Sequence, residues 1–156
     1  MKKTFALLMA VSMSFVSLVP AFAAENIGVS PVNPTTQVEQ IEPRTTSKPS
    51  SSETWNCKNE GTYYFSGRAA YDDLYTDYRF FGSTSYTITV ANLKGRNDED
   101  LKVTVYKCKA TGDKKIGSMT VQGQKTGVLD ISDLEVGDRI YIKFSAPSHF
   151  EGNITD

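Results

Sequence analysis

The segment Ser85-Tyr86-Thr87-Ile88-Thr89-Val90 decides the fold, because apolar and hydroxyl side chains alternate along it. The same alternation recurs in residues 101–105 and in residues 139–144. In an extended chain, such alternation places all the apolar side chains on one face. Each segment therefore predicts a β-strand with one buried face.

Four further segments predict strands by a weaker alternation: residues 62–66, 75–81, 115–122 and 127–131. Glycine-containing turns separate them, as in Thr111-Gly112-Asp113. Seven or eight short antiparallel strands predict an all-β fold, a small β-sandwich or jelly-roll-like domain. Residues 69–78 leave a helical turn open, because Tyr71, Leu74, Tyr75 and Tyr78 recur at helical spacing.

The N-terminal residues 1–23 are typical of a bacterial signal peptide. Two lysines precede an apolar run over residues 5–19, and Ala21-Phe22-Ala23 supplies small residues for cleavage. The run is shorter than the roughly 20 residues needed to span a bilayer. We therefore expect a secreted protein without stable membrane insertion after cleavage.

Residues 24–52 differ in composition from the rest of the chain. They contain no aromatic residue and four of the six prolines, Pro31, Pro34, Pro43 and Pro49. Such a composition buries too little apolar surface to order a chain, so it predicts a disordered linker. The folded domain is then expected over residues 53–156. The near balance of 17 Lys+Arg and 18 Asp+Glu excludes an electrostatic nucleic-acid binder.

The chain has two cysteines, Cys57 and Cys108. In an exported protein, two cysteines predict a disulfide, here a structural bond that holds the start of the domain against a strand. Two free thiols are the alternative.

Aromatic residues are concentrated between residues 62 and 86. The nine are Tyr63, Tyr64, Phe65, Tyr71, Tyr75, Tyr78, Phe80, Phe81 and Tyr86. Aromatic rings together with carboxylate and guanidinium groups suit a sugar or a protein surface. The hypothesis is an exposed face centred on Tyr71, Tyr75 and Tyr78, with Asp77 and Arg79. The alternative is that these rings fill the core.

Chemistry-bearing motifs are sparse. Asn97, Asp98 and Asp100 form a turn whose oxygen atoms suit calcium, although a charged hairpin tip is the alternative. The sole histidine, His149, is not part of a recognised catalytic or zinc motif. We expect a chain without enzymatic activity and without a cofactor other than this calcium ion.

The second half of the chain contains a further pattern of strands and turns. An acidic turn leads into a strand that ends in an aromatic residue at Tyr106, and Leu134-Glu135-Val136-Gly137 precedes another strand. With the closing Phe150-Glu151-Gly152-Asn153-Ile154, residues 85–154 resemble the bacterial pre-peptidase C-terminal domain. Ile154 stands where that family usually has an aromatic residue, and residues 53–84 have no counterpart. The resemblance implies a β-sandwich module that assists binding or secretion without catalysis.

The sequence thus favours a secreted, non-catalytic module that binds an extracellular polysaccharide or protein. The alternative is a cell-surface structural or interaction protein, or a small toxin or immunity-like factor, that acts through protein contacts.

Overall fold

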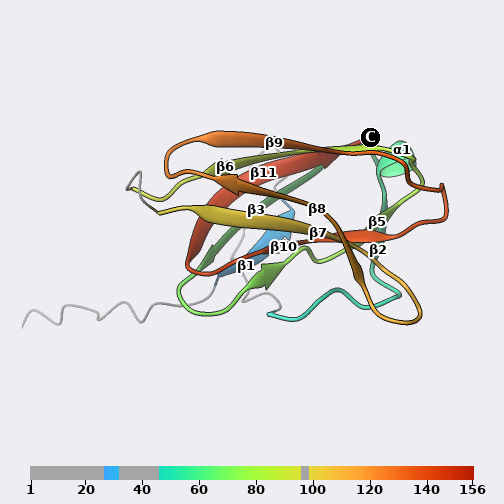
Figure 1. Ribbon diagram of the computed structural model, residues 1–156, viewed down its shortest axis with the longest axis horizontal. Coiled ribbons are helices and arrows are strands. Elements are labelled where there is room, and N and C mark those ends of the chain that lie inside the picture. Colours follow the sequence, from blue (N-terminus) through green and yellow to red (C-terminus); the bar gives the residue numbers. More distant parts are fainter. Residues whose placement is uncertain (1–26, 32–45, 96–98) are drawn as a thin grey trace, which may run out of the picture.

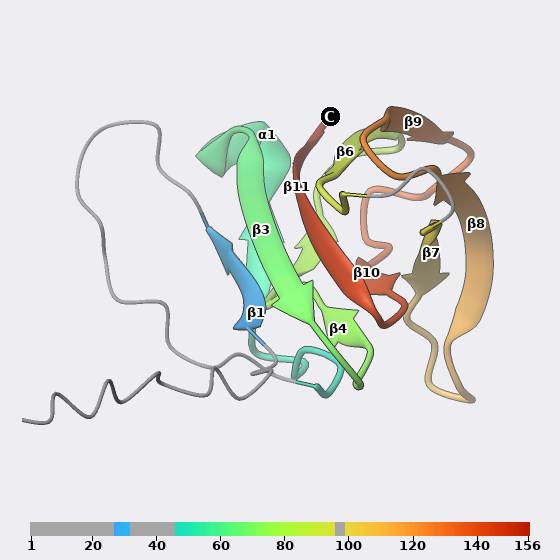
Figure 2. The ribbon, with the colours of Figure 1, turned by 90° about the vertical axis from the view of Figure 1, so that its left-hand side faces the viewer.

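Two β-sheets pack face to face in the computed structural model, which describes residues 27–31, 46–95 and 99–156 (Figures 1 and 2). The five-stranded sheet has the order β1-β3-β11-β6-β9, with strands Ile27–Pro31, Tyr63–Ala69, Ser148–Thr155, Tyr86–Asn92 and Thr126–Ile131. The six-stranded sheet has the order β2-β5-β10-β7-β8, with strands Thr54–Asn56, Arg79–Phe81, Ile140–Phe144, Leu101–Lys107 and Lys114–Val121. Its sixth strand, β4 (Leu74–Tyr75), also pairs with β10. The predicted all-β sandwich is confirmed.

The three segments with the clearest alternation form β6, β7 and β10. In β6, Tyr86, Ile88 and Val90 are buried, whereas the residues between them are half-buried. The odd-numbered apolar residues of β7 and the even-numbered ones of β10 are likewise buried. One face of each strand therefore supplies the core between the sheets.

Aromatic rings from both sheets fill much of this core. Phe144 of β10 packs against Phe65 of β3 and Phe150 of β11, with ring centroids 5.3 Å and 3.9 Å apart. All three side chains are at most 1% exposed. Full burial of a ring of this size stabilises the fold by roughly 1.5–3 kcal/mol.

The structure contains more strands than the seven or eight predicted, and one pair is parallel. β2 runs parallel to β5, and the other pairs in the described residues are antiparallel. Residues 69–78 contain no helix; the short strand β4 lies there instead. The one helix of the described residues is α1 (Cys57–Glu60), which the side chain of Asn56 caps. No helix in these residues is long and apolar enough to cross a membrane.

Part of the predicted linker belongs to the sandwich. β1 lies within residues 24–52 and pairs with β3. Residues 46–52, here called the strap, also contact the domain, because Arg79 Nε and Arg139 Nη1 donate hydrogen bonds to the carbonyl oxygens of Pro49 and Ser51. These contacts belong to residues inside the segment predicted as a linker, and the predicted division into linker and domain stays a prediction. Residues 1–26, with the predicted signal peptide, and residues 32–45 lie outside the described residues.

The predicted disulfide is wrong: Cys57 and Cys108 are both free. Cys57 directly follows β2, and Cys108 directly follows β7. Strands β5 and β10 lie between β2 and β7 in the sheet. At ~4.8 Å per strand, β2 and β7 are ~14 Å apart, whereas a disulfide needs Cα atoms roughly 4.4–6.8 Å apart.

Candidate functional site

Three tyrosines lie together on the outer face of the six-stranded sheet: Tyr75 of β4, Tyr106 of β7 and Tyr141 of β10. We call them the tyrosine face. The register pairs Tyr141 with Tyr106 and Lys143 with Tyr75. Because Ile140 and its alternate neighbours in β10 point into the core, Tyr141 and Lys143 point to the other side of the sheet.

The rings of the tyrosine face contact one another. The centroids of Tyr106 and Tyr141 are 5.4 Å apart, with an angle of 16° between the ring planes. Tyr75 and Tyr141 are 6.1 Å apart at 48°. Tyr75 and Tyr106 are half-buried, and Tyr141 between them is buried. The outer two tyrosines are therefore the ones that a ligand can reach.

Charged groups frame the tyrosine face on two sides. On one side, the ammonium group of Lys143 lies 5.8 Å from the centroid of the Tyr75 ring and forms an ion pair with Asp73 at 2.6 Å. On the other side, the Tyr141 hydroxyl donates a 3.0 Å hydrogen bond to Asp113, which also pairs with Lys48 of the strap at 2.8 Å. These contacts fix the charges around the rings.

The pKa shifts agree with this arrangement. The hydrogen bond from Lys48 holds the pKa of Asp113 below its usual value. Burial opposes ionisation of Asp73, but the hydrogen bonds from Lys143 and from the Ala146 amide hold its pKa below the usual value as well. Burial and the Asp113 carboxylate raise the pKa of Tyr141. At neutral pH the site therefore presents ionised aspartates and a protonated Tyr141 hydroxyl.

Among the sequence-predicted candidates, Tyr75 belongs to the tyrosine face. Tyr71 is 80% exposed in the turn before β4. Tyr78 instead packs against the core, with its ring centroid 5.7 Å from that of Trp55 and 5.6 Å from that of Tyr63. The predicted face of Tyr71, Tyr75 and Tyr78 is therefore not one surface.

The two predicted polar candidates have structural contacts. The Tyr63 hydroxyl donates a 3.4 Å hydrogen bond to Asp77, and Arg79 holds the strap through the Pro49 carbonyl. Both side chains thus contact other parts of the fold. The binding role predicted for them stays a prediction.

Sequence reasoning missed Tyr106 and Tyr141 as site residues. The alternation of apolar residues could have placed both tyrosines on the outer face of their strands, because Tyr141 lies between Ile140 and Ile142 and Tyr106 follows Val105. A tyrosine at an outward position of a strand does not fill the core. Two such residues in separate strands indicate an aromatic outer face once the strands are known to be neighbours.

The predicted calcium site falls largely outside the described residues. Asn97 and Asp98 are not described, and Asp100 is exposed at the start of the next segment. In the described part of the chain, no three His, Cys, Asp or Glu residues cluster so as to hold a metal ion. Calcium binding at Asn97, Asp98 and Asp100 stays a prediction.

Cys57, Ser148 and His149 are the described side chains considered for nucleophilic or acid-base chemistry. Burial, with the nearby Asp156 and Glu60, raises the pKa of the Cys57 thiol to about 12. Ser148 and His149 are adjacent in β11, so their side chains point to opposite faces of the sheet. Burial and the nearby Arg68 lower the pKa of His149. The arrangement suits binding through ring edges, hydroxyls and fixed charges.

Comparison of the chain with protein-family models, curated proteins and solved structures finds no match. The resemblance of residues 85–154 to the pre-peptidase C-terminal domain stays a prediction.

Proposed function

We propose that this chain is an exported, non-catalytic module that binds an extracellular ligand through the tyrosine face. The observation that carries the proposal is the cluster of Tyr75, Tyr106 and Tyr141 on the outer side of a sheet. The sandwich core lies between the sheets, so these rings are not needed to fill it. A tyrosine offers apolar area and a hydroxyl at a low cost in side-chain entropy, which suits recognition surfaces.

Two ligand classes fit this face. A polysaccharide is favoured by the fixed charges beside the rings, since Asp73, Lys143 and Asp113 offer donors and acceptors to sugar hydroxyls. A protein partner is favoured by the stacking of Tyr106 on Tyr141, because it leaves less free ring face for a sugar to stack on. The same substitutions test both classes.

The experiment compares the full chain with the double variant Tyr75→Ala/Tyr106→Ala in pull-downs on cellulose, chitin and bacterial cell wall. The matched control is Tyr64→Ala, since Tyr64 is 41% exposed on the opposite sheet. We expect retention of the wild type and of the control, and loss of retention for the double variant at an unchanged melting temperature.

Failure of the wild type to bind any of these glycans overturns the polysaccharide version. The protein version is tested by sedimentation velocity over a range of concentrations with a cell-surface protein extract. A shift that the double variant abolishes supports protein contacts. Absence of any shift together with absence of glycan retention overturns the proposed function.

A further inference from the structure

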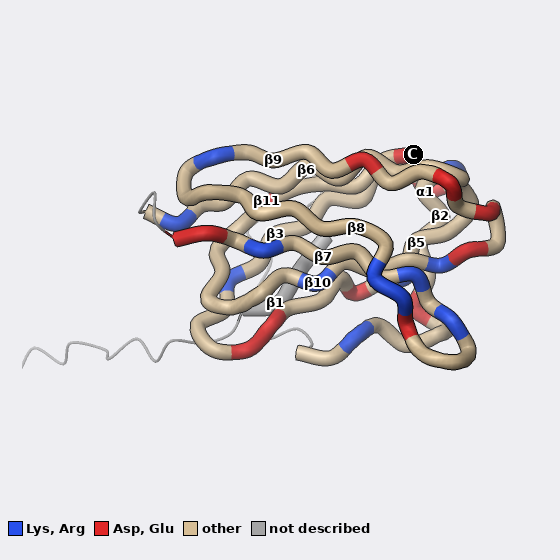
Figure 3. The backbone as a smooth tube through the Cα atoms, viewed as in Figure 1, with Lys and Arg blue, Asp and Glu red and all other residues tan. Residues whose placement is uncertain are grey.

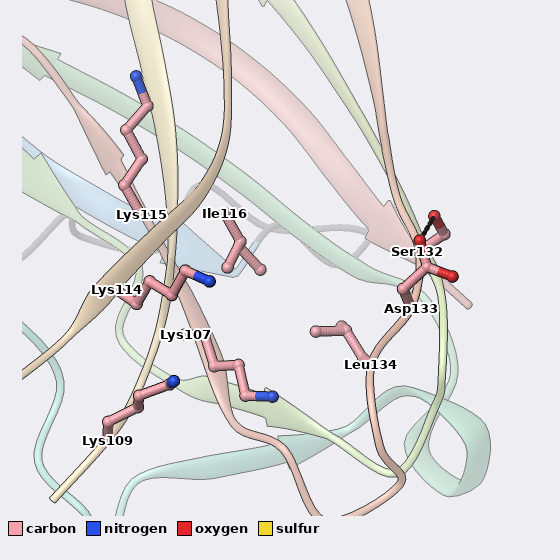
Figure 4. Close-up of a pocket in the computed structure, with 8 residues that line it drawn as sticks. All are labelled: Lys107, Lys109, Lys114, Lys115, Ile116, Ser132, Asp133 and Leu134. Atoms are coloured by element: carbon pink, nitrogen blue, oxygen red, sulfur yellow. Dashed lines mark hydrogen bonds between the residues drawn. The ribbon is translucent and has the colours of Figure 1, made fainter.

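Basic residues gather where β7 turns into β8, on a domain with nearly balanced charge (Figure 3). Next to this turn is a pocket of about 320 Å³, between the β7–β8 hairpin and the segment that follows β9 (Figure 4). Four lysines line it, Lys107, Lys109, Lys114 and Lys115. This lysine pocket adjoins the tyrosine face at Lys115, which pairs with Tyr106. The function proposed above does not use it.

The strand register explains why the lysines converge. Lys107 pairs with Lys114 across the β7–β8 ladder, and Tyr106 pairs with Lys115. Directly paired residues share one face of a sheet, so Lys114 shares the face of Lys107, while Lys115 shares the outer face with Tyr106. In Figure 4, Lys107, Lys109 and Lys114 point into the same space and Lys115 extends away from it.

The positive charge in the pocket is only partly neutralised. Asp138 pairs with Lys107, and its charge also interacts with that of Lys109. Asp133 accepts a hydrogen bond from the Ser132 hydroxyl at 3.1 Å. Neither Lys109 nor Lys114 has an ion-pair partner among the residues that the structure describes. The nearby Asp113 is paired with Lys48.

Like charges directly opposite each other destabilise a sheet. The pairing of Lys107 with Lys114 therefore lowers the stability of the folded chain, and Asp138 offsets it on one side only. An anion in the pocket would offset this repulsion, because Lys107, Lys109 and Lys114 point into the same space. Leu134 and Ile116 also line the pocket, whereas Lys109, Lys114 and Lys115 are exposed to solvent.

We propose that the lysine pocket is a second binding site, which holds a phosphate group with more than one negative charge. Each ammonium group is a compact charge with three donors, which suits the oxygens of a phosphate. A single carboxylate carries one negative charge and would neutralise only one of the two unpaired lysines. A multiply charged phosphate neutralises both.

The test measures the binding of inorganic tripolyphosphate to the full chain by titration calorimetry. A second arm uses dextran that carries phosphate esters, to separate a free anion from a polymer-bound one. The variants are Lys109→Gln and Lys114→Gln, and the matched control is Lys125→Gln, an exposed lysine in the turn before β9. We expect each pocket variant to weaken binding about tenfold, which corresponds to about 1.4 kcal/mol, and the control to leave binding unchanged.

A thermal readout separates this role from a structural one. We expect tripolyphosphate to raise the melting temperature of the wild type, since a ligand that binds only the folded state stabilises it. Lys114→Gln should match or exceed the wild-type melting temperature without anion and gain less from its addition.

Two outcomes would overturn the proposal: no binding of either probe at millimolar concentration, or equal weakening by Lys125→Gln, which would indicate general charge attraction. Binding of both probes should persist in Tyr75→Ala/Tyr106→Ala, so failure at one site is distinguishable from failure at the other.

Discussion

The rings of Phe144 and Phe150 stack with their centroids 3.9 Å apart and an angle of 19° between their planes. Phe144 lies in β10 of the six-stranded sheet, and Phe150 lies in β11 of the five-stranded sheet. The pair therefore joins the two layers of the sandwich at the centre of its core.

Substitution of Phe150 by alanine should lower the free energy of unfolding by about 3–5 kcal/mol, because it removes a fully buried ring and leaves a cavity. The measurement is urea denaturation followed by fluorescence. Phe81→Ala is the control, since Phe81 is only half-buried in β5. This variant should lower the free energy of unfolding by less than Phe150→Ala does. A loss below about 1 kcal/mol for Phe150→Ala would contradict the described core.

Gly152 is predicted to tolerate no side chain. A Cβ atom there would lie 2.1 Å from the Thr89 carbonyl oxygen and 2.8 Å from the Phe65 ring. We expect Gly152→Ala to abolish cooperative unfolding or to lower the melting temperature by far more than Gly137→Ala. A Cβ at Gly137 meets nothing within 4 Å, so that control should change stability by less than about 0.5 kcal/mol. Equal melting temperatures for the two variants would refute the close approach at β11.

Asp113 should make part of the stability depend on pH. The Lys48 ammonium and the Tyr141 hydroxyl lower its pKa in the folded chain. Its contribution is then complete above the unfolded pKa of about 3.9 and is lost as the pH falls through the lower folded pKa.

The variant Asp113→Asn should therefore be less stable than the wild type at pH 7, by about 0.5–1 kcal/mol for a solvent-accessible ion pair. The two proteins should converge near pH 2. Urea denaturation at both pH values measures this difference. The exposed Asp100→Asn is the control, and a constant difference between Asp113→Asn and wild type at all pH values would argue against the ion pair.

The two thiols should differ in reactivity. Cys108 is half-buried, whereas Cys57 is buried, with 1% of its surface exposed. Burial raises the pKa of the Cys57 thiol to about 12. A thiol reagent at pH 8 should therefore label Cys108 slowly in the native chain and Cys57 only after denaturation. Mass spectrometry of the labelled peptides gives the order, and Cys108→Ser should take up almost no label while folded. An unlabelled native mass lower by two hydrogens would instead indicate a disulfide.

The sequence predicted the strands whose faces differ most in burial. Ile88 and Ile142 lie at the centre of clear alternations because each strand has a single buried face. The short strands β2 and β4 were harder to predict from sequence, since two or three residues are too few to show an alternation of apolar and polar side chains. Tyr71, Tyr75 and Tyr78 recur at helical spacing, yet pairing of Tyr75 with Lys143 outweighs that local preference.

The site depends on strand order, which local sequence does not contain. Cys57 and Cys108 could form a disulfide only if β2 and β7 were neighbouring strands. Two strands, β5 and β10, lie between β2 and β7. The same order brings Tyr106 and Tyr141 together, although 34 positions separate them along the chain. The clustering of the lysines in residues 107–115 does not depend on strand order, because the β7–β8 hairpin turn alone brings them together.

The position of β11 sets the order in which the sandwich can form during synthesis. β11 pairs with β3 on one side and β6 on the other, and it is the last strand of the described chain to leave the ribosome. Before β11 is present, this sheet can form at most two separate pairs, β1 with β3 and β6 with β9. Such distant contacts close slowly, on a scale of milliseconds to seconds for all-β domains. The five-stranded sheet thus cannot reach its final strand order until β11 has been synthesised.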